Sequence, residues 1–358
     1  MEFNDFSPQV ESHYKNNLPF VVYKEPSSET LHGMFQHTVK QHVIKGLQRT
    51  GFVFVPYNKK NRSLIIPDEH ATSVTCQVPN DFFNPKPMHP STAVQSDVDA
   101  NYSAMVSHAL KTIEKGDLDK VVCSRKLSVS GINDPIKLLF ETLKTYQDAY
   151  VYGFFHPRVG FWIGASPETF IKVDGTTFKT MSLAGTQRVY PDTKPNWSTK
   201  EIQEQAFVTN AITESLESLV KVIVVSKTYN RRAGSLWHIC NDVSGTLKNK
   251  KEMLQRILDA LHPTPAVCGL PRDKAQKFIN RHEGYNREYY TGFLGRVTDG
   301  FNAKLFVNLR CMKLRGTTAE LFVGGGITQG SNVMDEWVET VNKAETMKQI
   351  LRSVTPVI

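Results

Sequence analysis

Short strand-forming segments joined by tight turns are the feature that most constrains how this 358-residue chain can fold. Asp174-Gly175 separates the run 169–173 from 176–182, and Asp299-Gly300 and Arg315-Gly316 separate three further runs. Turns this short join antiparallel strands, whereas parallel strands need a crossover of about a dozen residues or more. We therefore predict an α+β fold, a large antiparallel β-sandwich with helices packed outside.

Helical segments are interleaved with these strands. An apolar helical pattern ends at Gly116, Asp134 and the proline after it begin a second helix, and Ser198 with Glu201 forms a capping box for a third. This third helix is predicted to run to about Val220. The remaining predicted elements are strands at 120–129, 150–155, 161–164 and 305–314 and a helix at 254–261.

The N-terminal part of the chain is less informative. Residues 1–95 show no decisive pattern, and 84–96 hold three prolines, as a linker does. We interpret 1–95 as the N-terminal part of the same fold and 96–358 as the catalytic region, within one domain.

Charge and composition narrow the function classes. The net charge of +8 and the pI near 9.1 favour an anionic partner. No run of five basic residues supports nucleic-acid binding, so a non-catalytic anion or nucleic-acid binder is the weak alternative. Five cysteines without a C-x-x-C pair, no signal-peptide pattern and no apolar run of about 20 residues favour a soluble, cytoplasmic protein without a membrane segment.

Two helices carry paired acids. Glu336 and Glu339 lie three residues apart with Lys343 one turn further, and Glu201 and Glu204 repeat this spacing. Carboxylates from two helices can converge on Mg²⁺, which prefers oxygen ligands and keeps room for an anionic substrate. The alternative is ordinary surface acids with a Glu339–Lys343 pair along one helix.

Four further positions are candidates for chemistry. Lys120 begins an apolar strand, where desolvation would let its amine act as a base, unless it only extends to solvent. Glu168 follows a proline at a strand boundary, where a raised pKa would suit a proton donor, although a turn glutamate is the simpler alternative. Arg310 and the amides of Gly324–Gly326 could hold a carboxylate. His238, between two apolar residues, is more typical of a buried histidine than of a catalyst.

Several blocks occur together in the order of one family, the chorismate-utilising enzymes, which include isochorismate, salicylate and anthranilate synthases. The resemblance covers about residues 100–352. The blocks that carry it are Lys120–Arg125, Gly164–Glu168, Leu183–Thr186, Lys200–Glu204, His262–Gly269, Arg287–Gly292, Leu309–Cys311, the glycine run and Glu336–Lys343.

The resemblance implies the family's fold and a Mg²⁺-dependent conversion of chorismate. Lys120 stands where ammonia-adding members carry Gln, and His262–Val267 resembles the isochorismate synthases. The implied reaction is water attack at C2 of chorismate with loss of the C4 hydroxyl, an isomerase reaction that can feed menaquinone or siderophore biosynthesis. Salicylate synthase, which goes on to eliminate pyruvate, is the alternative. No glutaminase subunit is implied, and a monomer is one of the states left open.

The resemblance also assigns roles to individual residues. Lys120 is implied as the base and Glu168 as the acid, while Glu204 and Glu339 match the metal ligands, with Glu201 and Glu336 as neighbours. Gln205 departs from the histidine that relatives commonly carry. The substrate-binding positions implied are Gly185, Thr186, His238, Tyr289, Arg310, Gly324, Gly325, Gly326 and Lys343.

Overall fold

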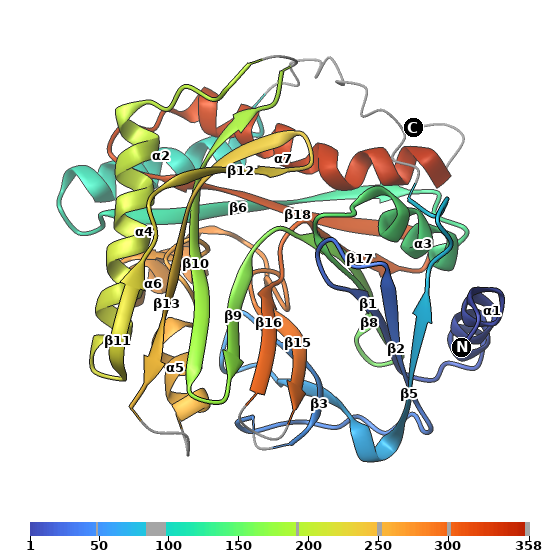
Figure 1. Cartoon of the computed structure of the whole chain (residues 1–358). Helices are drawn as coiled ribbons and strands as arrows, with labels where there is room; N and C mark the ends of the chain where they lie inside the picture. The colour runs from blue at the N-terminus through green and yellow to red at the C-terminus, as the bar shows by residue number, and fades with distance from the viewer. Residues whose placement is uncertain (48, 84–97, 191–192, 249–252, 299–301, 355–358) are drawn as a thin grey trace.

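The computed structural model describes the whole chain except residues 48, 84–97, 191–192, 249–252, 299–301 and 355–358. Its described residues form two nine-stranded sheets in which every pair of neighbouring strands is antiparallel (Figure 1). The predicted α+β class with large antiparallel sheets is confirmed. The predicted linker at 84–96 and the Asp299-Gly300 turn lie outside the described residues.

The first sheet combines N-terminal, central and C-terminal strands. In spatial order its strands are β14 (Gly269–Leu270), β6 (Lys120–Ser130), β18 (Thr318–Ile327), β17 (Cys311–Arg315), β8 (Gly160–Ser166), β7 (Tyr150–His156), β1 (Phe20–Lys24), β2 (Thr30–Gln36) and β5 (Ala71–Gln77).

The second sheet also combines strands from distant parts of the sequence. Its order is β11 (Val220–Val225), β13 (Leu236–Leu247), β10 (Thr177–Arg188), β9 (Thr169–Asp174), β16 (Asn302–Val307), β15 (Phe293–Thr298), β3 (Gly51–Val55) and β4 (Leu64–Pro67), and β12 (Tyr229–Ala233) also pairs with β13. Strands from residues 1–95 thus belong to both sheets.

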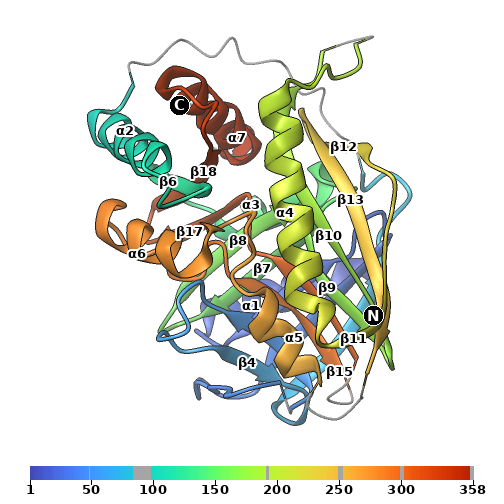
Figure 2. The same cartoon turned by 90° about the vertical axis from the view of Figure 1, so that its left-hand side faces the viewer.

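Helices cover the outer faces of the two sheets. Figure 2 shows α4 and α5 against the second sheet, and α2, α6 and α7 gathered around β6 and β18. The helices are α1 (Phe3–Lys15), α2 (Ala100–Glu114), α3 (Pro135–Thr145), α4 (Thr199–Glu217), α5 (Met253–Leu261), α6 (Arg272–His282) and α7 (Val333–Val354), with a short 3₁₀ turn at Asp68–His70. Among the described helices, none has the length and apolarity required to cross a membrane.

Aromatic side chains fill the space between the sheets. The Tyr150 ring of the first sheet stacks on Phe306 of the second at 3.8 Å between centroids, and Phe54 packs on Trp162 from the opposite sheet. Burying rings of this size removes about 150–250 Å² of surface each from water. This inter-layer core fixes the two sheets face to face.

The chain crosses between the sheets at two places, and one of these crossovers departs from the predicted strands. The predicted strand 305–314 is broken, because β16 ends at Val307 in the second sheet and β17 begins at Cys311 in the first. The chain likewise passes from β8 to β9 through Pro167 and Glu168. The crossovers are joined by backbone hydrogen bonds, from Ala165 N to Arg310 O and from Val307 N to Glu168 O, both of 3.0 Å. Glu168 and Arg310 are thereby placed between the layers.

The predicted N-terminal caps of two helices are confirmed, but the predicted C-terminal end of one helix differs from the structure. Asp134 accepts a hydrogen bond from Lys137 N, and Ser198 and Glu201 form the capping box. The third helix ends at Glu217, so the prediction that it runs to about Val220 is wrong. The β-branched run that follows forms the edge strand β11 instead.

Candidate active site

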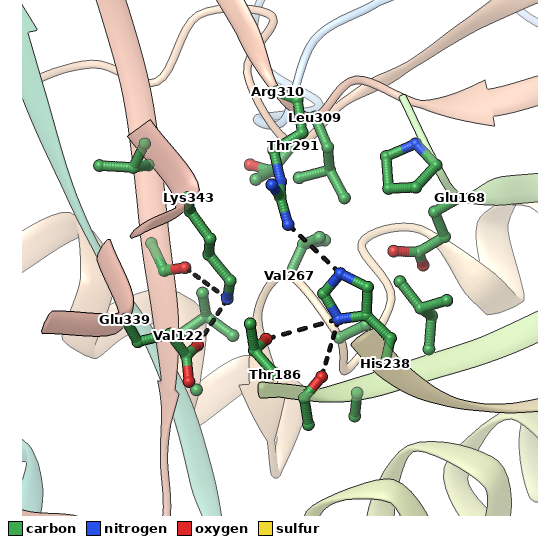
Figure 3. A pocket seen from close by; sticks show the side chains of 18 of the residues that line it. Val122, Glu168, Thr186, His238, Val267, Thr291, Leu309, Arg310, Glu339 and Lys343 are labelled. Carbon is green, nitrogen blue, oxygen red and sulfur yellow. Dashed lines mark hydrogen bonds and ion pairs between the residues drawn. The ribbon is translucent and has the colours of Figure 1, made fainter. Parts of the chain in front are cut away.

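A cavity of about 70 Å³ opens where the crossovers meet α4, α7 and β18 (Figure 3). Both sheets and both helices contribute to its wall. Its polar lining residues are Glu168, Thr186, Glu204, His238, Tyr290, Thr291, Arg310, Glu339 and Lys343, with the backbones of Gly185, Gly324 and Gly326.

Three glutamates beside the cavity are paired with three lysines. Glu204 is on α4, whereas Glu336 and Glu339 are on α7, so acids from both helices lie beside this cavity. The ion pairs are Lys120 Nζ–Glu204 Oε1 at 2.9 Å, Lys200 Nζ–Glu336 Oε1 at 2.5 Å and Lys343 Nζ–Glu339 Oε1 at 2.6 Å.

The glycine run of β18 makes room for these carboxylates. A Cβ atom added at Gly326 would lie 2.3 Å from Glu204 Oε1, and one added at Gly325 would lie 2.9 Å from Glu336 Oε2. A Cβ atom at Gly324 would lie 2.9 Å from the backbone oxygen of Cys123. Side chains at these positions would therefore displace the acids or the strand itself. Gly325 serves in this packing and does not line the cavity.

Burial and nearby charges set the protonation of the acids. Burial raises the pKa of Glu336 to about 7, with the charge of Glu339 adding to the rise and Lys200 opposing it. For Glu204, burial alone would raise the pKa, but the ammonium groups of Lys120 and Lys200 outweigh it, and the pKa is lowered. One carboxylate is therefore held charged while another titrates close to neutral pH.

Lys120 lies behind the cavity wall rather than on it. Its side chain is 1% exposed, and its ammonium faces Glu204, which does line the cavity. Lys120 Nζ makes no hydrogen bond to any described residue beyond this ion pair. The alternative of a lysine extending to solvent is excluded by this burial.

Glu168 is held protonated by its surroundings. Burial raises its pKa to about 8, although the charges of Lys120, Arg231 and Lys343 oppose the rise. The carboxyl group is thus mostly neutral at pH 7 and able to donate a proton. A solvent-exposed turn glutamate would not have this property.

A second polar group is built around His238. Its Nδ1–H donates to Gly185 O at 2.7 Å, which leaves Nε2 to accept from Arg310 Nη2 at 3.3 Å. Burial, followed by the charge of Arg310, lowers the His238 pKa to about 3, so the ring is neutral. Arg310 also donates to Thr346 Oγ1 at 2.8 Å. Its guanidinium therefore has no acid partner among the described residues and can receive a carboxylate.

Other predicted residues fall into two groups. Thr186 lies 3.4 Å from His238 Nδ1, and Lys343 donates to Gly324 O at 3.0 Å beside Glu339, so both belong to the cavity. Glu201 is occupied elsewhere, since its Oε2 accepts from Ser198 N in the capping box and from Gln187. Gln205 donates to Ser182 and Asn241 in the packing between α4 and the second sheet.

The structure does not place Tyr289 in the cavity. Tyr289 stacks on Phe54, with ring centroids 4.1 Å apart, and donates to Arg62 O. Its neighbour Tyr290 lines the cavity, and a Cβ atom at Gly324 would lie 3.2 Å from the Tyr290 hydroxyl. Sequence reasoning also missed Lys200, although it stands one residue before Glu201 in a recognised block.

The donor set is suited to a divalent cation. The buried carboxylates of Glu204 and Glu336 and the half-buried carboxylate of Glu339 lie beside the glycine run of β18, and Glu336 Oε2 is buried without a hydrogen-bond partner among the described residues. In the described part of the chain no three acidic, histidine or cysteine side chains already converge on a single point. The carboxylates face lysines instead, so a cation would compete with these ammonium groups.

Fold and site together define a class of enzyme. Residues 58–352 match the family model of chorismate binding enzymes, and the chain belongs to that family. Similar proteins include isochorismate synthase EntC of Escherichia coli strain K12, 32% identical over 263 residues that make up 70% of this chain and 66% of EntC. Isochorismate synthase DhbC of Bacillus subtilis strain 168 is 28% identical over 340 residues, 89% of this chain and 85% of that protein.

Solved structures support the same fold. A structure described as a 2,3-dihydroxybenzoate-specific isochorismate synthase, DhbC from Bacillus anthracis, has a TM-score of 0.80 at 24% identity and covers 96% of this chain and 99% of its own. Anthranilate synthase component I from Streptococcus pneumoniae has a TM-score of 0.68 at 19% identity, covering 92% of this chain and 89% of its own. The architecture is thus shared by members with different reactions.

Proposed function

We propose that the protein is an isochorismate synthase, which converts chorismate to isochorismate by adding water at C2 and losing the C4 hydroxyl. The buried Lys120, on the cavity side of β6, and the protonated Glu168, on the crossover, are the observation that carries the proposal. Lys120 takes a proton from the attacking water, and Glu168 gives a proton to the leaving hydroxyl. Each transfer contributes about 10² to 10⁴ in rate.

The relatives favour this reaction over the alternatives within the family. Both EntC and DhbC carry the name isochorismate synthase. Lys120 stands at the position where the ammonia-adding members are expected to carry Gln, so we expect neither ammonia as the nucleophile nor a glutaminase subunit. A salicylate synthase would also release pyruvate, so a pyruvate assay distinguishes a salicylate synthase from an isochorismate synthase.

Mg²⁺ is the proposed cofactor, held by Glu204 and Glu339 with Glu336 beside them. A bound cation supplies positive charge that neutralises a substrate carboxylate among these acids. Glu201, engaged in the helix cap, is not part of this set.

The remaining polar groups are proposed to orient the substrate. Arg310, kept in place by neutral His238 and Thr346, presents its guanidinium to one carboxylate of the dianion. Lys343, which donates to Gly324 O, lies on the other side of the cavity from His238 (Figure 3). Tyr290 replaces Tyr289 as the proposed tyrosine of this site.

The test is to incubate the purified protein with chorismate, with and without Mg²⁺, and to identify products by chromatography and mass. Isochorismate that forms only with Mg²⁺, without pyruvate, is the expected result. Anthranilate-type products on addition of ammonia would refute the water-adding reaction, and stoichiometric pyruvate would favour the salicylate reading.

A substitution tests the base. We expect Lys120→Gln to abolish turnover while chorismate binding, measured by calorimetry, stays largely intact, because Arg310 and Lys343, the groups proposed to orient the substrate, are unchanged. Activity equal to that of the unsubstituted protein would remove Lys120 from the role of base.

A further inference from the structure

A second cavity, of about 230 Å³, adjoins the first. The two cavities share Pro167 and Arg310 as lining residues. Its wall comes from the end of α3, from β12 and from α7. Its polar lining residues include Tyr146, Asp148, Arg231, Arg232 and Thr346.

The lining of this cavity carries more positive than negative charge. Arg231, Arg232 and Arg310 face one acid, Asp148, whose Oδ1 already accepts a hydrogen bond from Ser27 at 3.0 Å. Arg232 Nε donates to Gly234 O within its own turn. An anion that entered would therefore meet guanidinium groups and little repulsion.

Of these three arginines, Arg231 has the most hydrogen-bond donors available for an anion. It forms no ion pair with an acid among the described residues, and its Nη1 lies 4.0 Å from Met181 Sδ. Arg231 pairs with His238 across β12 and β13, which puts the two residues opposite each other in the sheet. Its charge also opposes the rise in the Glu168 pKa, so Arg231 lies within electrostatic range of the proposed acid.

We propose that the second cavity is an anion-binding vestibule, in which Arg231 receives a carboxylate of the substrate before Arg310 does. The inference rests on the proposed function, since it requires a dianionic substrate. Guanidinium groups bind carboxylates in a two-point geometry, and charge of one sign along a cleft raises the rate of association with an oppositely charged ligand. Arg231 and Arg310 thus form two successive carboxylate sites.

Steady-state kinetics with chorismate at pH 6.5 test the vestibule, because Glu168 remains protonated there. We expect Arg231→Gln to lower kcat/KM about tenfold at low ionic strength with kcat changed less than twofold, and to flatten the salt dependence of kcat/KM. Arg231→Lys, which keeps the charge, should recover most of the loss. Arg281→Gln on α6 removes the same charge from an exposed position and should leave both constants unchanged.

An unchanged kcat/KM and salt slope in Arg231→Gln would overturn the vestibule, as would a fall in kcat alone. If Arg231→Gln does not fold, Arg231→Lys provides the test. The salt dependence of its kcat/KM must equal that of the unsubstituted protein, and a different dependence would overturn the vestibule. Failure of the unsubstituted protein to convert chorismate would instead refute the proposed function, so the two failures are distinguishable.

Discussion

At the scale of single residues, position between the layers matters more than residue type. Glu168 lies on a crossover that the sequence marks by a proline at a strand boundary, whereas Arg310 lies on a crossover inside the predicted strand 305–314. Arg310 has φ of +46°, a conformation uncommon outside glycine, and this turns the residue out of strand alternation. The sequence motifs predicted which residues matter here, but not the backbone that places them.

Tyr289 and Tyr290 show the same limit. The two tyrosines are adjacent in the sequence. In a strand, neighbouring side chains point to opposite faces, so alternation would predict which tyrosine faces the cavity, but only if the segment were a strand. They lie in a turn between Glu288 at φ +49° and Thr291 at φ +61°, where alternation does not apply. The resemblance could identify this block, whereas the choice of tyrosine required coordinates.

The raised pKa of Glu168 predicts a pH dependence. A carboxyl with a pKa of about 8 donates its proton below that pH and loses this ability as pH rises through it. We expect kcat/KM for chorismate to fall above about pH 8 and Glu168→Gln to reduce kcat about 10² to 10⁴-fold. Initial rates between pH 6 and 10 provide the measurement. Full activity of Glu168→Gln at pH 7 would exclude the acid role.

The tyrosine pair offers a matched test. Tyr290→Phe removes a hydroxyl that lines the cavity, and a lost hydrogen bond to a charged ligand of about 1.5–3 kcal/mol corresponds to a KM increase of roughly ten- to a hundredfold. Tyr289→Phe removes a hydroxyl that only contacts Arg62 O, so KM should stay within about twofold. A larger KM effect from Tyr289→Phe than from Tyr290→Phe would reverse the assignment.

At the scale of elements, caps and hairpin turns were predictable because they depend on local chemistry. The capping box at Ser198 and the turn at Asp174-Gly175 are satisfied within a few residues. The strands of residues 1–95 were not predicted, since β1–β5 are stabilised by partners far along the chain, such as β7 and β15. Strands β11 and β12 were also missed, although both pair with β13, which follows them closely in the sequence.

Lys200 links the N-terminal end of α4 to α7 through Glu336 and gives the next prediction. In Lys200→Met the Glu336 carboxylate loses its counter-charge, so we expect the melting temperature to be lower in the absence of metal. With Mg²⁺ as the only ligand, we expect the affinity to rise about tenfold, which equals about 1.4 kcal/mol. Calorimetric titration of Mg²⁺ and thermal unfolding measure both. Lys194→Met removes the same charge from an exposed site and serves as the control. Weaker Mg²⁺ binding by Lys200→Met would show that this lysine assists the cation.

At the scale of the whole molecule, the glutamates connect the two layers. Glu204 is on the helix that covers the second sheet, and Glu336 and Glu339 are on the helix that packs along β18 of the first. A cation held by both helices binds the folded protein and not the unfolded chain, so it stabilises the assembly of the layers. The Lys200–Glu336 ion pair also joins α4 to α7.

Thermal unfolding of the intact protein tests this connection without any substrate. At a Mg²⁺ concentration 100 times the dissociation constant, the stabilisation is about 2.7 kcal/mol, enough to raise the melting temperature by several degrees. Glu204→Gln and Glu339→Gln should each strongly reduce this Mg²⁺-dependent rise in melting temperature, because each removes a carboxylate from one side of the site. Glu201→Gln is the control: it weakens the helix cap and so lowers the melting temperature, but the rise on adding Mg²⁺ should be unchanged. Equal melting temperatures in Mg²⁺ and in a chelator would mean that no cation is shared by α4 and α7, and the neutralisation of the substrate would then fall to Lys343 and Arg310.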